Sequence, residues 1–124
     1  MKRVFISHSF RSDPEGNMKK IRLIEKWLAA LGIAYFSPLS NYQALEDTDA
    51  KQREFGLRCC QEWIPYCDEL WLFGDWLNSE GCQRELNAAL LELIPVYIVI
   101  EWADDGWPIF KNGNGPKWLR RENS

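Results

Sequence analysis

The spacing of apolar residues changes along the chain from short continuous runs to a helical repeat, which predicts alternating strands and helices. Residues 3–7 are mostly β-branched or aromatic and lead into a polar stretch over 8–17, which predicts a strand followed by a loop. From Met18, apolar residues recur at helical spacing as far as Gly32, a residue suited to the left-handed turn that ends a helix. The first part of the chain therefore predicts a strand, a loop and a helix.

The middle of the chain repeats this order of strand and helix. Residues 33–36 predict a short second strand, and the polar connection over 37–49 is long enough to fold over a site. Phe55, Cys59 and Trp63 then share one face of a second helix, which ends where the following proline disfavours helical backbone angles.

Two further strands and a helix complete the pattern. Residues 69–74 are largely apolar, as a buried parallel strand should be. After a turn, Ser79 is a favourable N-cap for a third helix, whose apolar face carries Cys82, Leu86, Ala89 and Leu90. Residues 94–100 predict the fourth strand.

This order predicts an α/β fold, with a single doubly wound parallel sheet of about four strands and flanking helices, similar to the flavodoxin and Rossmann folds. We assign residues 1–101 to this domain and expect residues 102–124 to form an irregular, tryptophan-rich tail packed on the domain or on a neighbouring subunit. Parallel sheets bind ligands beyond the carboxyl ends of their strands, which here lie at residues 7–12, from 37 onward, and at 74–81.

Composition and charge narrow the possible ligands. A length of 124 residues suits one domain with one hydrophobic core. The net charge of −3 argues against nucleic-acid polymers, whose binding depends on many phosphate contacts, but leaves a small anionic ligand open. No apolar run approaches the roughly 20 residues of a membrane-spanning helix, and residues 1–3 lead into a strand-like run that we do not expect to be the apolar segment of a signal peptide. We therefore expect a cytoplasmic chain that does not engage a membrane.

The four cysteines lack the paired spacing that holds zinc, and His8 is the only histidine. We therefore expect no metal, no cofactor, and reduced, mostly buried thiols. Cys82 lies near a predicted helix start, where a helix dipole can activate a thiol, but no second histidine is present to act as its base. A cysteine nucleophile is accordingly disfavoured, and we interpret His8 as a hydrogen-bonding loop residue.

The segment from Asp75 to Glu85 combines the features of a ligand site. It follows Gly74 at a strand end and opens a helix, whose free N–H groups attract anions. Gly81 lets a ligand approach the backbone, and Glu85 lies about one and a half turns into the helix, where its carboxylate can act as nucleophile or base. The alternative is a glutamate paired with a cation on a solvated face. The apolar neighbours of Glu85 favour partial burial, which is costly unless the carboxylate is used in chemistry or paired.

Trp76 lies in the loop above the predicted pocket, where an indole ring can stack on a nucleobase. The alternative, that Trp76 packs in the core or at an interface, is slightly favoured because the chain has seven tryptophans. We keep Trp76, together with Gly74 and Asp75, as a candidate contact of the ligand.

Two motifs resemble the nucleoside 2-deoxyribosyltransferase-like superfamily. They are Cys-Asp-Glu-Leu-Trp-Leu-Phe-Gly over residues 67–74 and Ser79-x-Gly81-x-x-x-Glu85-Leu86, and the similarity extends over residues 2–100. It is closest to small bacterial and phage members of the superfamily, and the deoxynucleotide N-hydrolases are related to these. The resemblance implies that Glu85 attacks C1′ of the sugar and releases the base, and that Ser79 contacts a 5′-phosphate.

The loop after the first strand carries the same resemblance. It lines up with the corresponding loop of the hydrolases, where a serine and an arginine surround the nucleotide phosphate. This implies that Ser7 and Ser9 are contacts of the substrate and that Arg11 binds its phosphate. Without the resemblance, Arg11 is at least as well explained as a solvated loop charge. Two positions depart from the hydrolases, because Phe5 replaces a tyrosine and Cys60 replaces an aspartate that helps the base to leave.

The leading hypothesis is an enzyme that breaks the N-glycosidic bond of a nucleoside or nucleotide, by hydrolysis or by 2-deoxyribosyl transfer. An alternative is a non-catalytic nucleotide-binding module that lost the acid at Cys60. Residues 4–9 and Ser79-x-x-Cys82-x-x-Glu85-Leu86 are also similar to TIR domains, which implies an NAD glycohydrolase or a binder of an NAD-derived ligand. Relatives in the first superfamily build sites across subunits, so we expect a homodimer or a larger homo-oligomer.

Overall fold

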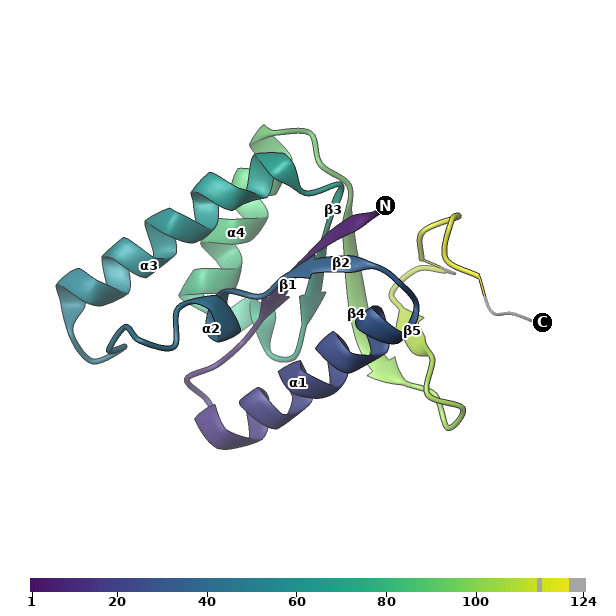
Figure 1. Ribbon diagram of the computed structural model, residues 1–124, viewed down its shortest axis with the longest axis horizontal. Helices are drawn as coiled ribbons and strands as arrows, with labels where there is room; N and C mark the ends of the chain where they lie inside the picture. Colours follow the sequence, from purple (N-terminus) through teal and green to yellow (C-terminus); the bar gives the residue numbers. More distant parts are fainter. Residues whose placement is uncertain (114, 121–124) are drawn as a thin grey trace.

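The computed structural model describes residues 1–113 and 115–120, and a five-stranded sheet lies at its centre (Figure 1). The strand order is β2-β1-β3-β4-β5. The parallel strands are β1 (Arg3–His8), β2 (Ala34–Phe36), β3 (Glu69–Phe73) and β4 (Val96–Trp102). The last strand, β5 (Pro108–Phe110), pairs antiparallel with β4 at one edge of the sheet.

Helices cover both faces of this sheet. Figure 1 shows α1 (Pro14–Ala30) on one side, and α3 (Ala50–Trp63) and α4 (Glu80–Leu91) together on the other. Short helical turns complete the connections, namely α2 (Pro38–Asn41), η1 (Ile64–Tyr66) and η2 (Trp76–Asn78). The predicted α/β fold with a doubly wound parallel sheet is therefore confirmed. None of the helices in the described part of the chain is long and apolar enough to cross a membrane.

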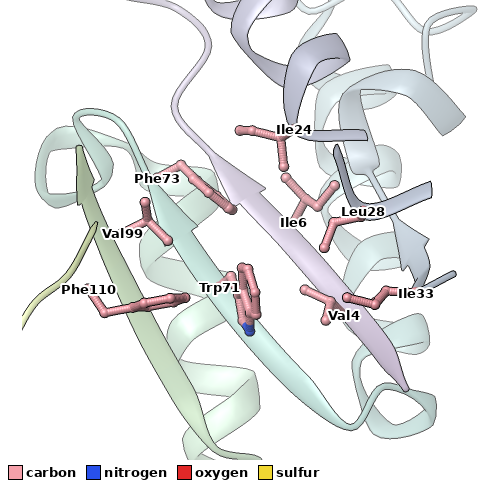
Figure 2. Packing of buried hydrophobic residues seen from close by; sticks show 9 residues of the cluster. All are labelled: Val4, Ile6, Ile24, Leu28, Ile33, Trp71, Phe73, Val99 and Phe110. Carbon is pink, nitrogen blue, oxygen red and sulfur yellow. The ribbon is translucent and has the colours of Figure 1, made fainter. Parts of the chain in front are cut away.

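Two hydrophobic cores, one on each face, hold the helices against the sheet. Successive strand residues point to opposite faces, so Ile6 and Trp71 pack on the α1 side whereas Phe5 and Leu70 pack on the side of α3 and α4. Figure 2 shows the core on the α1 side, where side chains from β1, β3 and β4 meet those of the helix. Every residue of β3 is buried, as its apolar run predicted.

α1 begins earlier than its hydrophobic repeat indicated. The side chain of Asp13 accepts a hydrogen bond from the backbone N–H of Gly16, and Pro14 occupies the first turn, where its missing N–H is tolerated. A capping residue and a proline do not belong to an apolar repeat, so the helical repeat in the sequence starts only at Met18. The predicted stop is confirmed, because Gly32 has a φ of 73° just after the helix.

The buried face of α3 differs from the face predicted from its aromatic residues. Phe55 and Trp63 are 57% and 47% exposed, whereas Cys60 in α3 and the following Ile64 are buried in the core. Trp63 is partly covered because its ring stacks on Phe36, with 5.2 Å between ring centroids. Small inward residues such as Cys60 add little to a hydrophobic repeat, so the larger exposed side chains dominated the sequence pattern.

The C-terminal tail is more regular than predicted. β4 continues to Trp102, and β5 folds back against it with a register irregularity between Val99 and Glu101. Phe110 at the end of β5 is buried, and its ring lies edge-on to Trp71 with 5.1 Å between centroids. The prediction of an irregular tail missed this strand, because 3 residues are too few to show an alternating period.

A buried carboxylate attaches the tail to the sheet. Glu69, which is 5% exposed, accepts a hydrogen bond from the indole N–H of Trp71 at 2.9 Å and another from the indole N–H of Trp118. The ammonium group of Lys2 lies 5.6 Å from the centroid of the Trp118 ring. Because a buried carboxylate needs hydrogen-bond donors, the two indoles make Glu69 an anchor for the tail.

We expect Trp118→Phe to lower the free energy of unfolding by about 1–3 kcal/mol, because Glu69 loses an indole donor in a buried setting. Urea unfolding followed by circular dichroism measures this loss. Trp102→Phe is the matched control, since Trp102 is 38% exposed and contacts Trp27 through ring edges. Its effect should stay within about 0.5 kcal/mol. Equal losses in the two variants would contradict the anchoring role of Glu69.

Candidate active site

A cavity of about 610 Å³ lies at the carboxyl ends of β1 and β3, and this volume is typical of a small-molecule site. His8 and Phe73 pair at these ends, so the loops that follow the two strands lie side by side. The 37–49 connection, part of α3 and the first turns of α4 form the other walls. Apolar side chains cover much of the wall, namely Phe10, Met18, Leu39, Tyr42, Leu45 and Leu57.

Glu85 from α4 lines this cavity and is only 5% exposed. The hydroxyl of Ser7 donates a hydrogen bond to its Oε1 at 2.7 Å, and the thiol of Cys60 also contacts the carboxylate. Burial raises the pKa of Glu85 to about 7, although both hydrogen bonds and the charge of Arg84 act in the opposite direction. The side chain is therefore divided between its acid and carboxylate forms near neutral pH, as groups that perform acid–base or nucleophilic chemistry often are.

The N-terminus of α4 forms one wall through Ser79, Glu80 and Gly81. Ser79 is the N-cap, as predicted, and its Oγ accepts a hydrogen bond from the N–H of Cys82 at 3.2 Å. A Cβ atom on Gly81 would lie 3.3 Å from Cδ2 of Leu57 in α3, so glycine lets the two helices approach each other. Because the first residues of α4 line the cavity, the positive end of the α4 dipole faces the space that a ligand would occupy.

Ser9 and Asp75 join the ends of β1 and β3 beside the cavity. The backbone N–H of Asp75 donates to Ser9 Oγ at 3.0 Å, and both residues line the cavity. Gly74, which precedes Asp75, has a φ of 66°, and a Cβ atom there would lie 2.6 Å from Ser9 Oγ. Both the backbone conformation and the lack of space therefore require glycine at this position.

Four charged side chains form a chain of ion pairs along the cavity wall. Nε of Arg11 donates to Asp47 at 2.7 Å, and Nε of Arg53 lies 3.8 Å from the other carboxylate oxygen of Asp47. Arg53 also reaches Glu80, with Nη2 2.9 Å from Oε2. The Arg11 side chain is 60% exposed, so its ion pair adds little stability and leaves the guanidinium accessible to a ligand.

Most of the residues predicted from the sequence line this one cavity, namely Ser9, Arg11, Asp75, Ser79, Gly81 and Glu85. Ser7 does not line it, because its side chain is fully buried and bonded to Glu85. Gly74 also lies outside the cavity, and Trp76 packs partly buried against the core on the side of α3 and α4. Trp76 thus follows the packing alternative, and the roles of the lining residues toward a ligand stay predictions.

Sequence reasoning missed the individual residues that the 37–49 connection and α3 bring to the cavity. The hydroxyl of Tyr42 lies 3.0 Å from the indole Nε1 of Trp63 and accepts its hydrogen bond. Asp47 and Arg53 contribute the ion pairs described above. The connection was expected to fold over a site, but no spacing rule identifies these side chains, because tertiary contacts fix their positions.

The two departures from the hydrolase pattern have different surroundings. Phe5 is fully buried, and its ring stacks on Phe36 with 5.3 Å between centroids. The hydroxyl that contacts Glu85 belongs to Ser7, two residues further on the same face of β1. Cys60 lines the cavity, and burial raises the pKa of its thiol far above the usual range, so the thiol keeps its proton.

Neither Cys82 nor His8 shows a sign of activation. All four cysteines are free, as the sequence predicted. Burial raises the pKa of Cys82 to about 11, which disfavours the thiolate that a nucleophile needs. Burial lowers the pKa of His8, and its Nδ1 lies 2.7 Å from the carbonyl oxygen of Ser9. Over residues 1–113 and 115–120, no group of three or more histidine, cysteine or acidic side chains could hold a metal ion.

The comparisons with known proteins agree with this fold. Residues 2–99 match the family described as Domain of unknown function (DUF7768), and the chain belongs to that family. No curated protein sequence matches the chain. Among solved structures, the 2-deoxyribosyltransferase of the psychrotolerant bacterium Bacillus psychrosaccharolyticus has 26% sequence identity and a TM-score of 0.63, over 77% of this chain and 70% of that one. The chain therefore has a nucleoside deoxyribosyltransferase-like fold.

Glu85→Gln should remove a pH dependence of stability. The pKa of Glu85 is about 7 in the folded protein and 4.5 ordinarily, so its contribution to stability is present below pH 4.5 and is lost as the pH rises through 7. The stability of the variant relative to wild type should consequently increase by roughly 3 kcal/mol between pH 4 and pH 8. Urea unfolding at several pH values measures this difference.

Glu92→Gln is the control for this measurement, because Glu92 is exposed and directly follows α4. Its unfolding free energy should change with pH in parallel with wild type. A parallel curve for Glu85→Gln as well would show that the pKa of Glu85 is not raised in the folded protein.

Proposed function

We propose that this chain breaks the N-glycosidic bond of a nucleoside or nucleotide, by hydrolysis or by 2-deoxyribosyl transfer, with Glu85 as the nucleophile. One observation carries the proposal, namely a buried glutamate on the wall of a cavity of about 610 Å³, held by the Ser7 hydroxyl and with a pKa of about 7. The similarity of the fold to a 2-deoxyribosyltransferase supports the same class of reaction.

In the proposed reaction, the Glu85 carboxylate attacks C1′ of the sugar while the C1′–N bond breaks, and the bonding electrons leave with the base. The intermediate is a glycosyl ester of Glu85. Water, or a ring nitrogen of a second base, then attacks C1′ and restores the free carboxylate. The first step requires ionised Glu85, so the rate should rise with pH up to about 7.

Departure of the base is easier when an acid protonates it. The Cys60 thiol is poorly suited to this role because burial raises its pKa. Asp75 and Glu80 are the carboxyl groups that we consider instead, since both line the same cavity as Glu85. Asp75 is the better candidate, because Glu80 is already paired with Arg53 at 2.9 Å.

The surroundings of Cys60 also support a second candidate function, a nucleotide-binding module without catalysis. In this version, the cavity and its charged wall bind the ligand, and the missing acid prevents release of the base. Glu85 would then act as a buried hydrogen-bond acceptor for the sugar hydroxyls. Binding without turnover distinguishes the module from the enzyme.

We further propose that the ligand carries a phosphate. Arg11 and Arg53 lie on the cavity wall near the N-terminus of α4, and both now pair with carboxylates. A phosphate offers guanidinium groups the same bidentate geometry with a larger charge, so it can replace Asp47 and Glu80 as their partner. Because the Arg11 side chain is exposed, a phosphate can approach its guanidinium group directly.

Base release is the direct test of the enzyme. Wild-type protein is incubated with a panel of ribo- and deoxyribonucleosides, their 5′-monophosphates and NAD, and free base or nicotinamide is followed by chromatography. We expect base release from at least one nucleoside or nucleotide, and a loss of at least about 10³-fold in Glu85→Gln, which keeps the shape but not the nucleophile. Tight binding without release would support the module, and nicotinamide release would support NAD as the substrate.

Charge on the cavity wall should determine preference for phosphate. Arg11→Ala and Arg53→Ala should each raise KM or Kd for a nucleoside 5′-monophosphate about tenfold, because each removes a charge-assisted contact, and should leave the values for the nucleoside unchanged. Arg58→Ala is the control, since Arg58 is an exposed cation of α3 that does not line the cavity. An equal effect on nucleoside and monophosphate would contradict the phosphate role.

A further inference from the structure

Ser7 is the most deeply buried polar contact of Glu85, and the proposed reaction above gives its hydroxyl no role of its own. Its side chain is 0% exposed and does not line the cavity. Oγ lies 2.7 Å from Oε1 of Glu85, a length typical of a hydroxyl bonded to a carboxylate. A ligand in the cavity therefore meets the carboxylate and not the serine.

The direction of this hydrogen bond depends on the charge of Glu85. An ionised carboxylate only accepts hydrogen bonds, so Ser7 must donate its proton to Oε1 whenever Glu85 is charged. The thiol of Cys82 makes a further hydrogen-bonding contact with Ser7, and burial keeps that thiol protonated. A hydroxyl has one proton, so Ser7 cannot donate to Cys82 while it donates to Glu85.

The same bond fixes the orientation of the carboxylate. Ser7 lies on β1, which is hydrogen-bonded to strands on both sides, and Glu85 lies on α4, which packs on the same face of the sheet. With Oε1 bound to the strand and Cys60 also in contact, the carboxylate has few alternative rotamers. Its remaining acceptor positions can face the cavity that Glu85 lines.

We propose that Ser7 is a positioning residue, which holds the Glu85 carboxylate toward the cavity and stabilises its charged form. This inference rests on the proposed N-glycosidic reaction and reassigns Ser7 from a contact of the substrate to a contact of the nucleophile. Ser9, the next serine on the loop, has a different role, since its Oγ binds the backbone N–H of Asp75.

The test compares Ser7→Ala with Ser7→Thr, which restores a hydroxyl in a β-branched residue suited to a strand. The alanine variant should move the acidic limb of the pH profile of kcat upward by about one pH unit, so that kcat at pH 6 falls about tenfold. KM should stay unchanged because Ser7 does not touch the substrate. The threonine variant should recover most of the wild-type pH profile.

A second measurement does not depend on turnover. Titration of the Glu85 carboxyl carbon by ¹³C nuclear magnetic resonance should show the same upward shift of its pKa in Ser7→Ala, and a wild-type titration in Ser9→Ala. If wild-type protein releases no base, the enzymatic proposal fails, and the titration still decides whether Ser7 stabilises the charged glutamate. An unshifted titration in Ser7→Ala, or a loss of kcat that is equal at every pH, overturns the inference.

Discussion

The burial of one carboxylate is the constraint on which the site depends. Removing Glu85 from water is unfavourable, and the fold offsets part of this cost with the Ser7 hydroxyl, which is separated from it by 78 positions in the sequence. That contact exists only because β1 occupies an inner position of the sheet and α4 packs across it. The parallel arrangement also brings the loops after β1 and β3 to one edge, where the cavity opens.

Much of the architecture follows from local sequence patterns, and the exceptions have physical causes. β3 was predictable because a strand buried on both faces needs an apolar run, and α4 because Ser79 caps an apolar repeat. The start of α1 was not visible, since its cap and proline carry no repeat. The orientation of α3 was misleading for another reason, because Cys60 fills an inward position that a larger apolar residue would have marked.

In the candidate site too, some residues could be predicted from local sequence and others depend on tertiary contacts. Glu85 and Ser79 could be located from spacing along a single helix, which fixes their separation before any packing is known. Asp47 and Arg53 could not, because their place at the cavity depends on ion pairs between segments that only the complete fold brings together. Ser7 was recognised as a residue of the site, but its contact with Glu85 could not be predicted, since sequence alone does not show which helix covers an inward strand position.

The two edge strands of the sheet limit how this molecule can pair with other molecules through its strands. β2 and β5, the two outermost strands, have 3 residues each, and β5 begins with a proline, which cannot donate to a neighbouring strand. Long unpaired edges act as templates for intermolecular strand addition, and here both borders offer only a few free backbone groups. The anchored tail therefore covers the longer β4 with a short strand that begins with a proline, which leaves little of this border free for strand addition.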